Sequence, residues 1–193
     1  MKSDIILCGV GGQGILSIAT IIGEAALIDN LHLKQSEVHG MSQRGGDVQS
    51  NLRISSDPIS SDLIPLGKAD LIISLEPMEA LRYLPYLNKN GWIVTNSVPF
   101  INIPNYPELE AVMQQLETFP RKVVLDVEKI AKECGSVRSA NMVLLGAAAS
   151  FVGIPYEMLQ EGIRRTFARK GEAIVEMNIN ALAAGKAVAD TLR

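Results

Sequence analysis

"DIILCGVGGQGILSIATIIGEAALI", residues 4–28, decides the fold because its hydrophobic pattern changes period at a glycine-rich turn. Asp4 to Cys8 is a short, continuous apolar run, which is typical of a strand buried on both faces of a parallel sheet. From Ile15 onward, apolar residues recur at spacings of three and four, which predicts a helix that ends near Asp29 and Asn30. Strand, glycine turn and helix together form the first half of a βαβ unit.

The rest of the chain continues this alternation. Further core strands are predicted at 71–75, 92–96 and 122–127, and helices at 77–84, 109–116, 127–134, 141–151, 155–167 and 172–191. Asn90 and Gly91 predict a turn, and the proline-rich segment 97–107 predicts a loop. The sequence therefore predicts one α/β domain over residues 1–193. It is expected to be three-layered and Rossmann-like, with a mostly parallel sheet, helices on both faces and a helical C-terminal part.

Composition excludes several classes of protein. The chain has 193 residues, 47% of them hydrophobic and 20% charged, and a net charge of −3, which gives no electrostatic reason to expect nucleic acid. No apolar stretch reaches membrane-spanning length, and the N-terminus has no signal-peptide pattern, so we expect a cytoplasmic protein. The two cysteines, Cys8 and Cys134, form neither a disulfide framework nor a metal or cluster site.

The glycine turn matches the pattern G-x-G-x-x-G, with Gly9, Gly11, Gly12, Gln13 and Gly14 as its candidate anion-binding residues. Such a turn can hold a pyrophosphate at the start of a helix. A dinucleotide site also expects an acidic residue about twenty positions further on, at the end of a second strand. That strand would be the short, polar segment 31–35, and Glu37 comes late for the role. Two interpretations stay open: anion binding, or small residues that allow a sharp turn and close helix packing.

A second motif, "SEVHGMSQRGGDVQSNLRI" at residues 36–54, gathers residue types that build sites. Its glycines interrupt any helix, so residues 37–46 are predicted to form a loop that exposes backbone N–H groups. Arg44 suits a bidentate contact with phosphate or carboxylate, and His39 suits hydrogen-bond or proton donation. The loop is expected just after a parallel strand, where α/β folds bind ligands; the alternative is a polar surface turn. Residues 48–54 alternate, which predicts an edge or antiparallel strand with one solvated face.

These motifs carry a family resemblance. "GVGGQGIL" (9–16), the 36–54 motif and "ISLEPMEALRYL" (73–84) resemble the gamma-type subunit or domain of the 2-oxoacid:ferredoxin oxidoreductases. Within that family they are similar to the beta subunits of the indolepyruvate:ferredoxin oxidoreductases. "EVHGMSQRGG" is the most specific of these matches, and "RSANMVLLGA" (138–147) and "NINALAAGKA" (178–187) extend the resemblance over nearly the whole chain.

The resemblance implies a reaction and a division of labour. The reaction is the oxidative decarboxylation of a 2-oxoacid, arylpyruvates in the indolepyruvate members, to acyl-CoA, CO₂ and reduced ferredoxin. Thiamine diphosphate and the [4Fe–4S] clusters are expected in a larger partner subunit. This chain agrees, because residues 45–47 read Gly-Gly-Asp instead of Gly-Asp-Gly and no cysteine set is present. It is therefore expected to be an accessory subunit of a hetero-oligomer that meets ferredoxin through the complex, with no catalytic residue or cofactor of its own.

The resemblance also implies a place for the second motif. Its loop would face the active-site entrance of the complex and contact coenzyme A, through Glu37, His39, Gly40, Met41, Ser42, Gln43, Arg44, Gly45 and Gly46. The alternative function is a stand-alone dinucleotide-binding oxidoreductase or a nucleotide-binding regulatory protein. The two differ in what the isolated chain does: the alternative would bind a dinucleotide without a partner.

Overall fold

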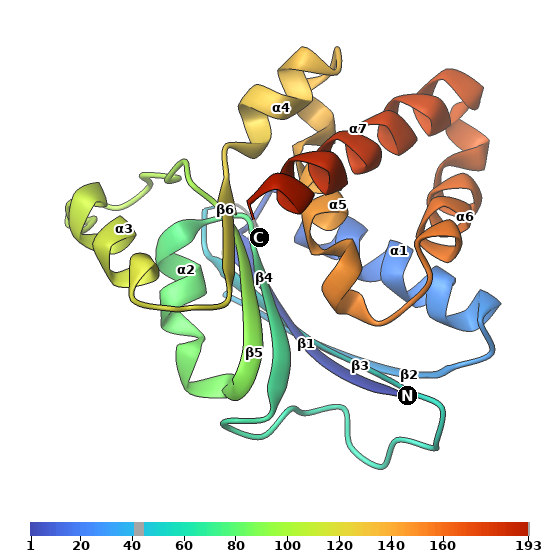
Figure 1. The fold of residues 1–193 in the computed structure, drawn as a ribbon, viewed down its shortest axis with the longest axis horizontal. Coiled ribbons are helices and arrows are strands. Elements are labelled where there is room, and N and C mark those ends of the chain that lie inside the picture. Colours follow the sequence, from blue (N-terminus) through green and yellow to red (C-terminus); the bar gives the residue numbers. More distant parts are fainter. Residues whose placement is uncertain (41–44, 193) are drawn as a thin grey trace.

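The computed structural model describes residues 1–40 and 45–192 (Figure 1). Its six-stranded sheet has the order β2-β3-β1-β4-β5-β6. The strands are β1 (Lys2–Val10), β2 (His32–His39), β3 (Asp47–Ser55), β4 (Ala69–Ser74), β5 (Leu87–Asn96) and β6 (Lys122–Leu125). β1, β4, β5 and β6 run parallel, whereas β3 is antiparallel to both β1 and β2. The predicted mostly parallel sheet is confirmed.

Helices cover both faces of the sheet (Figure 1). One face carries α1 (Ile15–Ile28), α4 (Val127–Glu133), α5 (Ala140–Val152), α6 (Tyr156–Phe167) and α7 (Glu172–Thr191). The other face carries α2 (Pro77–Arg82) and α3 (Leu109–Glu117). Short 3-10 turns lie at Leu84–Tyr86, Val137–Ser139 and Ala168–Lys170. The three layers and the helical C-terminal part are thus as predicted, and no helix among the described residues is long and apolar enough to cross a bilayer.

The apolar run of β1 is explained by its two buried faces. Ile5 and Leu7 join the main core with α1 and the C-terminal helices, while Ile6 and Cys8 pack on the opposite side with Tyr83. Because successive strand residues point to opposite faces, a strand covered on both sides needs apolar residues at every position. β1 therefore holds the glycine turn at a fixed place on the carboxyl edge of the sheet.

Residues 37–39 of the second motif are strand, and the loop prediction was wrong for these residues. Glu37 and His39 lie in β2, paired with Ser50 and Val48 of β3. β2 is an edge strand with mostly polar, solvent-exposed residues. Its sequence therefore lacks the hydrophobic alternation from which a strand is predicted. The loop follows an antiparallel strand, not the expected parallel one. Two successive antiparallel pairings nevertheless give β2 the direction of β1, so both strands end at the same edge of the sheet.

β3 is antiparallel as predicted, but it lies inside the sheet and its polar face is largely covered. Asn51 is buried, and its Oδ1 accepts a hydrogen bond from the Ile64 backbone N–H at 3.3 Å. Arg53 contacts the buried Asp4 carboxylate at 2.8 Å and donates to the carbonyls of Ser61 and Leu63. The segment that follows β3 thus folds back over this face, which an alternating pattern by itself does not show.

Candidate functional site

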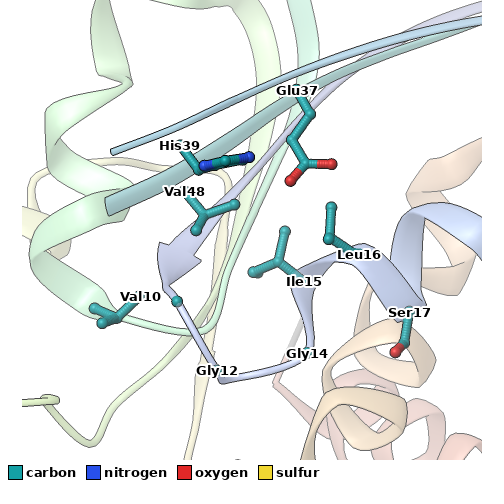
Figure 2. Close-up of a pocket in the computed structure, with 10 residues that line it drawn as sticks. Val10, Gly12, Gly14, Ile15, Leu16, Ser17, Glu37, His39 and Val48 are labelled. Carbon is teal, nitrogen blue, oxygen red and sulfur yellow. The ribbon is translucent and has the colours of Figure 1, made fainter. Parts of the chain in front are cut away.

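The two motifs meet in one cavity of about 470 Å³ at the carboxyl edge of the sheet (Figure 2). One wall is the glycine turn and the start of α1, and the other is the end of β2 with Val48 of β3. In Figure 2 the Glu37 carboxylate and the His39 ring lie across the opening from Ile15 and Leu16. The described lining residues are Val10, Gly11, Gly12, Gly14, Ile15, Leu16, Ser17, Glu37, His39 and Val48. Residues predicted from two separate patterns therefore share one site.

Backbone hydrogen bonds hold the two motifs together. The Gly11 N–H donates to the Gly46 carbonyl at 2.8 Å, and the Gly45 N–H donates to the Gly11 carbonyl at 3.2 Å. Gly12, Gly14 and Gly45 have φ angles of +103°, +92° and +79°, which glycine adopts far more readily than other residues. The glycines of both motifs thus allow a close approach of two backbones. Met41, Ser42, Gln43 and Arg44 lie outside the described residues.

Gln13 shapes the turn from within. Its Oε1 accepts from the Val10 N–H at 2.7 Å, and its Nε2 donates to the Leu75 carbonyl at 3.1 Å. Asn141 of α5 adds a third tie, because its Nδ2 donates to the Gly14 carbonyl at 3.2 Å. The turn is therefore fixed to the ends of β1 and β4 and to α5, and the Gln13 amide is engaged inside the chain.

The chemistry of the cavity wall is mixed. Glu37 and His39 are exposed, and the His39 Nδ1 lies 3.0 Å from the Gly40 carbonyl. No Lys or Arg lies among the described lining residues. Glu37 does share the cavity with the glycine turn, as the acid of a dinucleotide site would. However, β3 separates its strand from β1, whereas a Rossmann site places the acid on the adjacent strand. The wall offers hydrogen-bonding groups and an exposed backbone, without a nucleophile–base pair among the described residues.

A buried acidic cluster beside the Gly45–Gly46 backbone was missed by the sequence reasoning. Glu76 is fully buried, and its carboxylate accepts from the backbone N–H groups of Glu79 at 2.8 Å and Phe100 at 3.4 Å and from the Tyr106 hydroxyl. It is also the N-cap of α2, immediately before Pro77. An acidic residue between a core strand and Pro at the first helical position is the signal that could have revealed this cap.

Neighbouring groups complete this cluster. Burial raises the pKa of the Glu79 carboxyl, and Arg82, with its Nε 2.8 Å from Glu79 Oε2, opposes that rise. Burial also raises the pKa of the Tyr83 hydroxyl, which donates to Asp47 Oδ2 at 3.4 Å, and that of Tyr106. Both tyrosines therefore stay protonated at neutral pH and serve as hydrogen-bond donors.

The proline-rich segment connects this cluster to the second motif. Tyr106 and Phe100 are hydrogen-bonded to Glu76, and the Asn102 Nδ2 donates to the Gly45 carbonyl. A continuous set of hydrogen bonds thus runs from the N-cap of α2 through residues 100–106 to Gly45, and from there to Gly11 of the glycine turn. Gly45 and Gly46 are therefore held by residues far from them in sequence.

The cysteines are unlike those of a cluster site. Cys8 is buried in β1, its thiol contacts the Glu79 carbonyl at 3.7 Å, and burial raises the pKa of that thiol. Cys134 is partly exposed at the end of α4, and neither cysteine is in a disulfide. Among residues 1–40 and 45–192, no group of three or more His, Cys, Asp and Glu side chains is arranged to hold a metal ion.

Comparison with known proteins agrees with this architecture. The family model described as pyruvate ferredoxin/flavodoxin oxidoreductase matches residues 4–188. The chain belongs to this family. It is also 38% identical over 194 residues to the indolepyruvate oxidoreductase subunit IorB of Archaeoglobus fulgidus, a match that covers 96% of this chain and 94% of that one. The subunit-type assignment made from the motifs is thereby confirmed.

Solved structures of this oxidoreductase family share the fold. The gamma subunit of a keto/oxoacid ferredoxin oxidoreductase from Geobacter sulfurreducens superposes with a TM-score of 0.72 at 26% identity, covering 98% of this chain and 99% of that one. A 2-oxoglutarate:ferredoxin oxidoreductase from Magnetococcus marinus gives a TM-score of 0.77 at 23% identity, covering all of this chain but 32% of that one. The fold thus occurs both as a separate oxidoreductase subunit and as part of a longer chain.

Proposed function

We propose that this chain is the non-catalytic subunit of an indolepyruvate-type 2-oxoacid:ferredoxin oxidoreductase. The observation that carries the proposal is full-length similarity to an indolepyruvate oxidoreductase subunit in a chain without the residues for the redox chemistry. The complex would convert an arylpyruvate and CoA to the acyl-CoA and CO₂ and pass electrons to ferredoxin. This subunit would complete the active site without supplying a reacting group.

The residues of this chain do not fit the cofactors of the reaction. A [4Fe–4S] cluster is held by four thiolates, and the sequence has two cysteines, of which Cys8 is buried in the core sheet. Residues 45–47 do not form the thiamine motif. The backbones of Gly45 and Gly46 are instead hydrogen-bonded to the backbone of Gly11. Thiamine diphosphate and the clusters are therefore assigned to a larger partner subunit.

Purification from the native host tests this assignment. We expect a tagged chain to co-purify with a larger polypeptide that carries thiamine diphosphate and iron–sulfur clusters, whereas the isolated chain is colourless and has no redox activity. A chain that purifies alone with a bound dinucleotide would instead support the stand-alone oxidoreductase. Cofactor analysis of the two preparations separates these outcomes.

For the cavity between the glycine turn and β2, we propose a place at the active-site entrance, in contact with coenzyme A. Its volume lies within the range of small-molecule sites, roughly 300–1,000 Å³. Exposed backbone of the glycine turn and the motif that contains Arg44 supply groups that suit the phosphates of CoA. Glu37 and His39 would shape the entrance and hydrogen-bond the ligand.

Arg44→Ala tests the CoA contact in the assembled enzyme. Loss of one charge-assisted hydrogen-bonding group should raise the KM for CoA by about tenfold, since such bonds contribute roughly 1.5–3 kcal/mol. The KM for the 2-oxoacid should change much less. Arg164→Ala, which removes an exposed cation from α6, is the matched control. An unchanged KM for CoA in Arg44→Ala would contradict the contact.

A further inference from the structure

A second cleft, of about 390 Å³, adjoins the glycine turn at Gly12. Its walls include residues that end or follow four parallel strands: Gln13 after β1, Leu75 after β4, Asn96 at the end of β5 and Val127 after β6. The chain leaves β1 toward α1 on one face of the sheet and leaves β4 toward α2 on the other (Figure 1). The cleft therefore lies at the topological switch point, where open α/β sheets bind ligands.

Among the described residues, this cleft is lined by a cation, whereas the cavity of Figure 2 is not. Arg138 is exposed, and no ion pair or hydrogen bond joins its side chain to the rest of the described chain. No other Lys or Arg is found among the described residues that line this cleft. A guanidinium at the rim of a cleft suits a phosphate group, to which it can donate two parallel hydrogen bonds.

Apolar side chains at the same rim suit a flat ring. Phe100 is 44% exposed and Val137 is 50% exposed, although both are apolar and line the cleft. Aromatic side chains stack on nucleobases, and this stacking stabilises binding of any of the bases because every base has a π-face. Glu128, which is exposed in the same cleft, can accept hydrogen bonds from ribose hydroxyls.

The remaining polar walls are fixed by bonds within the chain. The Asn96 Nδ2 donates to the Val98 carbonyl at 3.0 Å, and its Oδ1 accepts from the Val127 N–H at 3.3 Å. Gln13 and Asn141 are bonded within the chain as described above. The cleft is thus held in shape without a ligand, which lowers the entropy lost on binding.

We propose that this switch-point cleft binds a nucleoside phosphate, with Arg138 on a phosphate group and Phe100 against the base. The proposal deepens the proposed function in one respect, because CoA carries such a group at its adenosine end and is the nucleotide that the reaction would supply. Gly12 lines both cavities, so a long ligand can reach from this cleft toward Glu37 and His39.

Calorimetric titration of the full chain with adenosine 3′,5′-bisphosphate, ADP and inorganic phosphate tests the cleft. We expect the wild type to bind both nucleotides. Arg138→Gln should weaken the affinity for the nucleotides and for inorganic phosphate by about tenfold. Phe100→Ala should weaken the affinity for the nucleotides by about tenfold and leave the affinity for inorganic phosphate unchanged, since it removes stacking on the base only. Arg164→Gln makes the same change of charge outside the cleft and should alter neither the affinity for the nucleotides nor that for phosphate. Absence of nucleotide binding by the wild type, or equal weakening in Arg164→Gln, overturns the proposal.

Kinetics of the assembled enzyme separate this proposal from the proposed function. If Arg138→Gln also raises the KM for CoA about tenfold, the cleft holds the nucleotide end of CoA. If Arg138→Gln leaves nucleotide binding by the chain intact while Arg44→Ala raises the KM for CoA, the cleft proposal falls and the proposed function stands. If the chain shows the expected nucleotide pattern but neither variant alters the KM for CoA, the cleft binds a free nucleotide and the proposed CoA contact falls.

Discussion

Gly146→Ala is expected to destabilise the protein by about 3 kcal/mol, because α5 and α7 touch at their backbones. A Cβ at Gly146 would lie 1.9 Å from the Leu182 carbonyl oxygen, and a Cβ at Gly185 would lie 1.9 Å from the Val143 carbonyl oxygen. Neither oxygen belongs to a side chain that can rotate away. The two helices must therefore separate, which opens the core that covers the sheet. The midpoint and slope of urea unfolding measure the loss.

A second helical glycine supplies the control for this prediction. A Cβ at Gly23 of α1 meets the Leu33 Cδ2 at 3.1 Å, and that atom is the mobile end of a side chain. Gly23→Ala should be near neutral or stabilising, since alanine is favoured over glycine in helices by about 1 kcal/mol. Gly146→Ala combined with Gly185→Ala should destabilise by less than the sum, because both widen the same interface. Equal stabilities of Gly146→Ala and Gly23→Ala would refute the backbone contact.

Glu76→Ala is expected to destabilise the protein by about 4 kcal/mol and to loosen the second motif. The substitution removes the cap of α2 and leaves the donors on Glu79, Phe100 and Tyr106 without their acceptor. A lost cap contributes about 1 kcal/mol, and each unsatisfied buried donor about 1–3 kcal/mol, less than additively. Since Asn102 joins this segment to Gly45, amide exchange of residues 45–46 and 100–106 should become faster.

Asp126→Ala is the matched control for Glu76→Ala. Asp126 is also an acidic N-cap after a core strand, and its carboxylate accepts only from the Lys129 N–H among the described residues. Its loss should lower the free energy of unfolding by about 1 kcal/mol and leave amide exchange near Gly45 unchanged. Tyr106→Phe, which removes the hydroxyl but keeps the Glu76 carboxylate and the cap of α2, should fall between wild type and Glu76→Ala. If Glu76→Ala and Asp126→Ala were equally stable, Glu76 would act only as the N-cap of α2, and its bonds to Phe100 and Tyr106 would contribute nothing to stability.

The sequence predicted the regular elements best where one pattern dominates. α7 begins at Glu172 and ends at Thr191, as the periodicity predicted, and the strand–turn–helix of residues 4–28 is confirmed. The prediction failed where context overrides local preference. Asn90 and Gly91 were expected in a turn but lie in β5, at an irregular pairing with β4. A Cβ at Gly91 would lie 2.4 Å from Leu87 Cδ1, so the glycine there reflects close packing within the sheet.

The site was predictable in its parts but not in its assembly. Gly11, Gly12 and Gly14 belong to a recognisable turn, and Glu37 and His39 to a specific motif. That these residues face one cavity depends on β2 pairing with β3 and β3 with β1, an order of strands that no local pattern contains. Arg138 and Phe100 line one cleft because β5 and β6, which precede them, are neighbours in the sheet, although the two residues are 38 positions apart in the chain.

The sequence by itself determined the alternation of strands and helices, the sharp glycine turn and the family to which the chain belongs. These are properties of neighbouring residues, because hydrophobic period and backbone freedom are set within a few positions. Only the tertiary structure decided that Glu76 is a buried centre of hydrogen bonds and that the second motif is held between Gly11 and Asn102. Contacts of this kind join residues many positions apart, and they exist only once strand order and helix packing have been chosen.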